Sequence, residues 1–174
     1  MLPVAHALLA ELDAEALATR RVLERLPSDH FNWQPHPKSM TAGQLAQHIA
    51  SIPGNAARLA GLDGFDVGAA PGTYAAAESR DALLATLDRS VASMQDAIRG
   101  LDENATQATW RLTANGREIA TWPRLTVIRT MGLNHWYHHR GELVVYLRLL
   151  GVPVPVVYGR SADENPFGAA ARNQ

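Results

Sequence analysis

Apolar residues recur at alternating intervals of three and four along several stretches of the chain, and this spacing most narrows what the chain can fold into. Such a seam is typical of α-helices that pack side by side in a left-handed bundle. Similar spacing predicts a first helix over about residues 3–26, a second over 41–60 and a last over 125–150. The chain is therefore predicted to be all-α, as a four-helix bundle. The clearest seam, in the third helix, is Leu84, Leu87, Val91, Met94, Ile98 and Leu101.

The second predicted helix has a clear start and an unusual middle. Thr41, with Gln44 three residues later, has the form of a capping box, in which the two side chains bond each other's backbone N–H groups. Pro53 cannot donate a hydrogen bond to a preceding carbonyl, and Gly54 follows it. We expect a kink or a short break there, before residues 55–60.

Two connections between the predicted helices stand out. The pair Asn115-Gly116 lies between residues 110–113 and 117–120, which is a strong signal for a small β-hairpin between helices three and four. Residues 61–77 form a long connection with five Gly and Pro residues. Long connections in compact domains are often functional, so we expect either a lid or an idle surface loop.

The chain has 174 residues, enough for one domain rather than two with separate cores. We expect a single domain over 1–174, with the bundle over about 3–155 and a loosely docked tail over about 160–174. Lys and Arg number 16 against 17 Asp and Glu, so neither nucleic acid nor an anionic membrane is an expected partner. The start of the chain does not resemble a signal peptide, and we expect a cytoplasmic protein.

The chain contains no Cys, which excludes thiolate metal ligands and a thiol nucleophile on the protein itself. Any metal must be held by His and carboxylate groups. The seam of the fourth helix carries such groups in positions expected to be apolar. An unpaired polar group costs about 1–3 kcal/mol when buried, so these side chains need a partner. The predicted seam is Leu125, Ile128, Gly132, His135, His139, Glu142, Tyr146 and Leu149.

His135 and His139 are four residues apart on one helical face, a spacing that lets two imidazoles bind one ion. His48 also falls on the apolar face of its helix, so three His are predicted to point inward. They can form a divalent metal site or a hydrogen-bonded core cluster. His138 lies about 100° around the helix from His139. It is expected to be exposed, or to contact a metal ligand without binding the metal itself.

These residues carry a resemblance to a known family. The signature around the last two His resembles the closing motif of the DinB/YfiT-like family, a family of metalloenzymes. The region before His48 resembles the family's earlier motif, and the match covers about residues 3–155. The matching sequences are NHWYHHRGEL at 134–143, LR at 147–148, GVP at 151–153, WQP at 33–35, SM at 39–40 and LAQHI at 45–49.

The resemblance implies an up-down-down-up bundle, often a homodimer, with a divalent metal such as nickel or zinc. The three His ligands of the family map to His48, His135 and His139. The family commonly has Gln where this chain has Glu142. Glu142 could therefore add a carboxylate to the site, accept a hydrogen bond behind a ligand, or pair with a nearby Arg.

An ion held by three neutral imidazoles keeps its full charge and an open coordination position. Characterised relatives include S-transferases and isomerases that use low-molecular-weight thiols, so the resemblance implies a metal-dependent thiol S-transferase acting on a small molecule. A hydrolase is equally open, with Glu142 or His138 as catalytic proton carriers. The alternatives are a non-catalytic metal-binding stress-response protein and a structural bundle whose His cluster is internally hydrogen-bonded.

Overall fold

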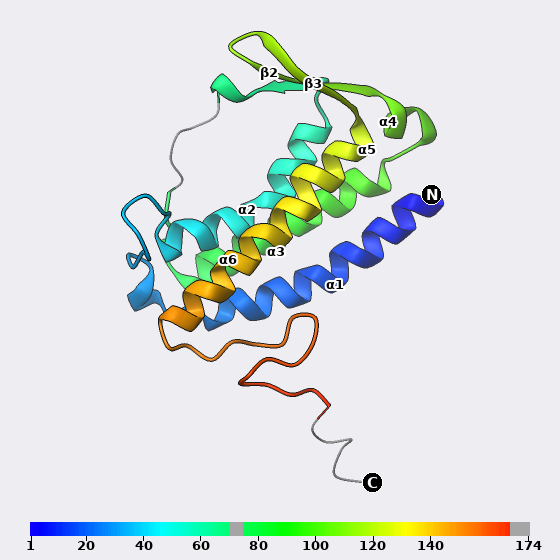
Figure 1. Cartoon of the computed structure of the whole chain (residues 1–174). Helices are drawn as coiled ribbons and strands as arrows, with labels where there is room; N and C mark the ends of the chain where they lie inside the picture. The colour runs from blue at the N-terminus through cyan, green and yellow to red at the C-terminus, as the bar shows by residue number, and fades with distance from the viewer. Residues whose placement is uncertain (70–74, 168–174) are drawn as a thin grey trace.

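The computed structural model of the protein describes residues 1–69 and 75–167 (Figure 1). It is mostly helical and carries a small three-stranded sheet at one end. The helices are α1 (Pro3–Arg25), η1 (Ser28–His30), α2 (Ala42–Ala60), η2 (Val67–Ala69), α3 (Arg80–Arg99), α4 (Glu103–Gln107), α5 (Arg124–Val127), η3 (Ile128–Asn134) and α6 (His135–Leu149). The strands are β1 (Gly64–Asp66), β2 (Thr109–Ala114) and β3 (Arg117–Pro123).

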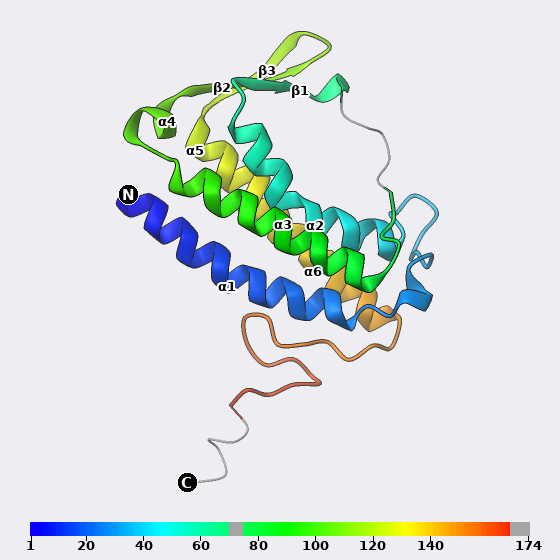
Figure 2. The same cartoon turned by 180° about the vertical axis from the view of Figure 1, so that it is seen from behind.

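The long helices form four rods that lie side by side, and the fourth rod consists of α5, η3 and α6 in succession. In Figures 1 and 2, α2 and α3 run in one direction, whereas α1 and the fourth rod run in the other. α1 contacts α3 and α6, and α2 contacts α3, η3 and α6. Most of the buried residues between the rods are apolar, and they include Leu8, Leu12, Leu23, Leu45, Ile49, Leu83, Leu87, Met94, Ile98, Leu143 and Leu147.

The capping box at the start of α2 is confirmed, since Thr41 accepts a hydrogen bond from the N–H of Gln44 and the Gln44 side chain accepts one from Thr41. Of the kink or short break predicted at Pro53, the structure shows the kink, since α2 is one helix that bends in both views without stopping. Next to Pro53, α2 packs closely against α3 at Gly54. A Cβ on Gly54 would lie 3.2 Å from the Cα of Ser90, so this glycine lets α3 approach.

The fourth rod differs from the regular helix that its spacing predicts. Residues 128–134 form a π-helix, in which each N–H bonds the carbonyl five residues back, and the extra residue per turn shifts the buried face. Leu149, predicted to point inward, is 62% exposed. His135 and His139 consequently lie on the flank beside α2 rather than on the central buried face. That face consists of Ile128, Gly132, Leu133, Trp136, Arg140, Leu143 and Leu147.

The predicted hairpin is confirmed. β2 and β3 pair in antiparallel fashion, and Asn115 and Gly116 both have positive φ, at 50° and 77°. Such a pair forms the tight turn whose twist matches that of the flanking strands. A third strand, β1, pairs with β2 in parallel and completes the sheet.

β1 and η2 lie within the connection 61–77, which we expected to be a lid or an idle surface loop, and residues 64–69 are instead a strand and a short helix. Asp66 fastens β1 to the hairpin turn. Its carboxylate accepts hydrogen bonds from the N–H groups of Gly68, Asn115 and Gly116 and from the hydroxyl of Thr113. These bonds lower the pKa of Asp66. Residues 70–74 of the predicted lid lie outside the described residues.

The segment after α6 returns along the rods and is tied to them by ion pairs. Glu164 contacts Arg21 and Arg25 of α1, and Asp163 contacts Arg148 of α6 at 2.6 Å. Asp163 and Glu164 of the predicted tail are therefore more firmly docked than its sequence suggested, whereas Phe167 is exposed. Residues 168–174 lie outside the described part of the chain.

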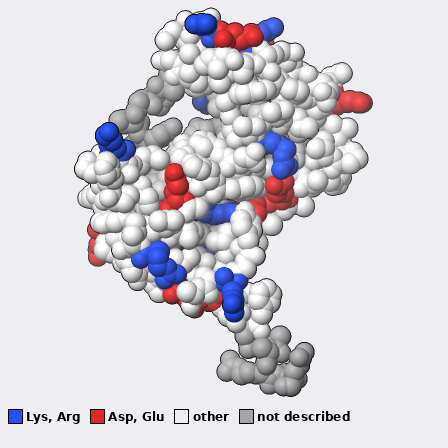
Figure 3. Space-filling model, viewed as in Figure 1, with Lys and Arg blue, Asp and Glu red and all other residues white. Residues whose placement is uncertain are grey.

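The face shown in Figure 3 mixes Lys and Arg with Asp and Glu, in agreement with the net charge of -1. It is hollowed between the sheet and the rods. Within residues 1–69 and 75–167, every helix is too short or too polar to cross a membrane.

Candidate metal centre

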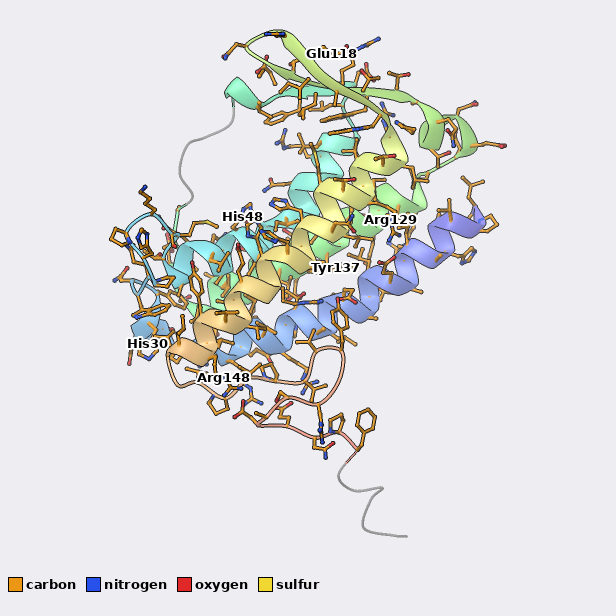
Figure 4. All side chains as sticks on the ribbon, viewed as in Figure 1. His30, His48, Glu118, Arg129, Tyr137 and Arg148 are labelled. Carbon is orange, nitrogen blue, oxygen red and sulfur yellow. The ribbon has the colours of Figure 1, made fainter. Side chains whose placement is uncertain are left out.

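Two rods bring three His together. His48 comes from α2 and faces the fourth rod (Figure 4), where His135 and His139 occupy the first two turns of α6. The Nε2 atom of His135 lies 3.3 Å from Nε2 of His48 and 2.8 Å from Nε2 of His139. All three residues thus offer ligand atoms within 4.8 Å of one another. The three His that the sequence singled out share one site.

The donor set fits a divalent ion. Two nitrogens that bind one tetrahedral zinc ion at about 2.0–2.1 Å lie roughly 3.4 Å apart, close to the 3.3 Å between His48 and His135. The shorter contact between His135 and His139 allows one proton to be shared between two nitrogens. Lone pairs that face each other at such distances repel unless a proton or a cation lies between them. A neutral tautomer can supply that proton as an N–H donor, and a bound cation would take its place.

Electrostatics keep two of these imidazoles neutral. The pKa of His48, which is 5% exposed, is lowered to about 4. Burial is the largest cause, and the nearby His139 and His135 contribute to the same shift. Burial also lowers the pKa of His135, with His139 as the next cause. The neutral imidazole is the form that binds metal, so the site holds both groups ready for an ion at neutral pH.

We expect the metal-free protein to lose stability as the pH falls from about 6.5 toward 4. In this window the unfolded chain binds a proton at His48, whose ordinary pKa is 6.5, whereas the folded chain does not. Protons therefore stabilise the unfolded state, and the loss can reach about 3 kcal/mol for a shift of this size. Urea unfolding in a chelator at pH 7.5, 6 and 5 measures the loss. A His48→Leu variant serves as the control, and an equally steep loss in that variant would contradict the assignment to His48.

Glu142 lies behind the cluster rather than within it. One carboxylate oxygen is 2.7 Å from Nδ1 of His139, and the other is 3.2 Å from Nε2 of His138. A carboxylate at Nδ1 accepts a hydrogen bond from the Nδ1–H group, which keeps the ring proton on that side and leaves the Nε2 lone pair of His139 directed at the cluster. His138 has a 64% exposed side chain and lies outside the group formed by the three Nε2 atoms.

A pocket of about 290 Å³ opens beside the cluster, and His48 and His135 form part of its wall. The α2 helix supplies one side, and Phe65 and Val67 of the β1–η2 segment supply another. The connection predicted to be either a lid or an idle surface loop is, at Phe65 and Val67, a wall of the pocket, and β1 is held in place by the sheet. The lining residues are His48, Ile52, Asn55, Ala56, Arg58, Leu59, Phe65, Val67, Met131 and His135.

The sequence and the fold can both be compared with known proteins. The model of the DinB family matches residues 1–167, nearly the whole chain. The chain belongs to the DinB family. A search among curated proteins found no match. The family membership confirms the resemblance drawn from the motifs around His48 and His135.

Solved structures of DinB-like proteins share the fold at low sequence identity. One from Bacillus subtilis is 19% identical, covers 87% of this chain and 98% of its own, and has a TM-score of 0.64. One from Bacillus cereus ATCC 10987 is 20% identical, with 86% and 95% covered and a TM-score of 0.67. A DinB family member from Exiguobacterium sibiricum 255-15 is 20% identical, with 90% and 97% covered and a TM-score of 0.65.

This DinB-family chain has a second polar cluster, around Arg140, that was not predicted from the sequence. Arg140 is 2% exposed, pairs with Glu15 of α1 at 2.5 Å, and donates to the hydroxyls of Thr19 and Tyr158. The signal was present, because Arg140 lies four residues after Trp136 and three before Leu143 on the apolar face. A cation at such a position needs a buried partner.

Proposed function

We propose that this DinB-family protein is a metalloenzyme that holds a divalent ion, nickel or zinc, through His48, His135 and His139 and acts on a small molecule. The observation that carries the proposal is the convergence of the three Nε2 atoms at the wall of a pocket. The proposal includes the four-rod, up-down-down-up arrangement, which the rod directions in Figure 1 support. It also includes the homodimer that the family resemblance implies.

An ion bound by three neutral imidazoles supplies Lewis acidity and lowers the pKa of a water or thiol that it binds. The residues of the chain position the site, exclude water and move a proton. His48 and His135 place the site at the pocket wall, and the apolar walls exclude bulk water around a bound substrate. Glu142 orients His139 through its Nδ1 atom and also contacts the exposed His138, so a proton that reaches Glu142 can pass through His138 to solvent.

We favour a thiol S-transferase over a hydrolase. The chain has no Cys of its own, so a thiol nucleophile must enter as a low-molecular-weight substrate. When the sulfur forms its new bond, the thiol loses its proton and the acceptor releases its leaving group as an anion. Glu142, the carboxylate beside the cluster, can take that proton and pass it to His138. A hydrolase would use the same path to take a proton from water. A non-catalytic metal-binding protein remains the alternative.

Metal analysis and a substrate screen test the proposal together. Protein purified without an affinity tag is analysed for bound metal, then loaded with nickel or zinc. It is assayed for transfer of cysteine, glutathione or bacillithiol to monochlorobimane, and for hydrolysis of p-nitrophenyl acetate. Metal with thiol transfer supports the transferase, and metal with ester hydrolysis supports the hydrolase. Metal with neither activity favours the non-catalytic alternative, and protein that binds no metal contradicts the proposal.

We expect Glu142→Gln to keep the fold and most of the metal but to slow turnover about a hundredfold, the usual scale for lost acid-base catalysis. Gln restores the side chain common in the family and removes the proton-carrying carboxylate. Weaker orientation of His139 should lower metal affinity by about tenfold at most, which saturating metal can offset. Glu103→Gln, an exposed change on α4, is the control. Full rate in Glu142→Gln would remove Glu142 from proton transfer.

We expect Phe65→Ala to raise KM by about tenfold and to widen the accepted substrates, because the side chain forms an apolar wall of the pocket. Metal content should stay unchanged, since Phe65 lies on β1 and contributes no ligand atom. Steady-state kinetics over a series of acceptors measures the effect. Ile119→Ala, which removes a 57% exposed side chain from β3, is the matched control. Equal kinetics in both variants would show that β1 is not a substrate wall.

A further inference from the structure

The chemistry of the pocket indicates what kind of molecule enters it. Most of the lining side chains are apolar, and α2 carries a row of them between two polar ends. His48 lies at one end of this row, and Asn55 and Arg58 lie toward the other, at the exposed rim. A ligand in the pocket therefore meets the His cluster, then an apolar stretch, then a cation. The apolar lining residues are Ile52, Ala56, Leu59, Phe65, Val67 and Met131.

Arg58 is available to a ligand. Its side chain lines the pocket, and no acidic side chain of the described residues lies within ion-pair distance of it. Other arginines of the molecule are engaged, such as Arg124 with Asp63 at 3.0 Å and Arg129 with Glu11 at 3.1 Å. A guanidinium at the mouth of an apolar pocket attracts an anion and can bind a carboxylate through two parallel hydrogen bonds.

The acidic residues near the pocket are directed elsewhere. Asp66 stands between the two wall residues Phe65 and Val67, yet both of its oxygens accept hydrogen bonds from the hairpin turn and from Gly68. Asp63 pairs with Arg124. Among the described residues that line the pocket, none is acidic. The interior field is therefore positive, and more so once the His cluster holds a cation.

We propose that the pocket takes an elongated apolar molecule with a carboxylate at one end, which Arg58 binds while the opposite, reacting end lies at His48 and His135. Arg58 follows His48 by ten residues, so the two are separated by about 15 Å along α2. A single guanidinium, assisted by the amide of Asn55, suits one carboxylate better than a more highly charged phosphate. Arg58 is thus a specificity residue.

The inference deepens the proposed function, since it assumes that substrate reacts at the His cluster, but carboxylate binding by Arg58 can be tested without metal. The probes are 6-mercaptohexanoate and 6-mercaptohexanol, which differ only in the terminal group. Isothermal titration measures both probes on zinc-loaded and zinc-free protein, for wild type, Arg58→Gln, Arg58→Lys and Arg117→Gln. Arg117→Gln removes an exposed charge from β3 and is the matched control.

In wild type we expect the acid to bind about tenfold more tightly than the alcohol, in the presence and absence of zinc. Arg58→Gln should abolish this preference, Arg58→Lys should retain part of it, and Arg117→Gln should leave it intact. Zinc should raise the binding affinity of both probes, because the thiol of each probe can bind the metal. Equal affinity for acid and alcohol in wild type, an undiminished preference in Arg58→Gln, or no binding of either probe would overturn the inference. Loss of the zinc effect alone would count against the proposed metal centre and leave the role of Arg58 standing.

Discussion

Replacing His48, His135 or His139 with alanine, one at a time, is expected to lower nickel or zinc affinity by at least about a hundredfold. Each change removes one of three ligands, and the remaining two cannot make up the lost bond. The metal content of the purified variants, measured by elemental analysis and by competition with a chromogenic chelator, should fall to near zero. In wild type, metal affinity should also fall in acid as protons compete for the imidazoles, and this fall should lie below pH 6.5, because burial lowers the pKa of His48 to about 4 and also lowers that of His135.

His138→Ala is the matched control, because His138 is the neighbour of His139 but lies outside the cluster of three Nε2 atoms. It should retain nearly all of its metal. Equal losses in all four variants would contradict the assignment of ligands. If wild type binds no metal and the three variants only lose stability, the cluster is a hydrogen-bonded part of the core.

Glu15→Ala is expected to destabilise the protein by about 3–5 kcal/mol, the largest effect on stability that the structure indicates outside the apolar core. Glu15 forms an ion pair with Arg140 at 2.5 Å, and Arg140 is 2% exposed. Without Glu15, the buried guanidinium keeps its hydroxyl and carbonyl partners and the rings of Tyr137 and Tyr158, but it loses the carboxylate that balances its charge. Urea unfolding of wild type and variant measures the change.

Two further variants separate charge burial from other effects. Glu24→Ala lies on the same helix and breaks only an exposed contact with Arg20 at 4.0 Å, so it should cost less than about 0.5 kcal/mol. The double variant Glu15→Leu with Arg140→Met removes both charges and should recover most of the lost stability. A double variant no more stable than Glu15→Ala would mean that the pair itself, rather than an unpaired charge, carries the effect.

Features that depend on neighbouring residues could be predicted from the sequence. The helices α1, α2 and α3 follow from the spacing of apolar residues, and the turn at Asn115-Gly116 follows from the preference of those residues for positive φ. His48, His135 and His139 come together because each lies on a helical face that turns toward the neighbouring rod. Local pattern and tertiary contact agree at these places.

Features that depend on distant contacts could not be predicted in the same way. β1 has three residues and pairs with a strand that begins 45 positions after it, so its sequence alone contains no strand signal. The π-helix at 128–134 shifts the register of α6, and a constant helical period cannot anticipate that shift. The pocket combines side chains from α2, β1 and η3, and only the packing of the sheet against the rods makes Arg58 part of it.

The attachment of β1 to the hairpin by Asp66 also bears on how such a protein can diversify. The three His of the cluster belong to helices that the core holds in place, whereas Phe65 and Val67 belong to a short segment outside those helices. Mutations in that segment can reshape the cavity without disturbing the cluster, provided that Asp66 keeps the segment docked. Descendants of one gene can therefore change the shape of the cavity while they inherit the same His cluster.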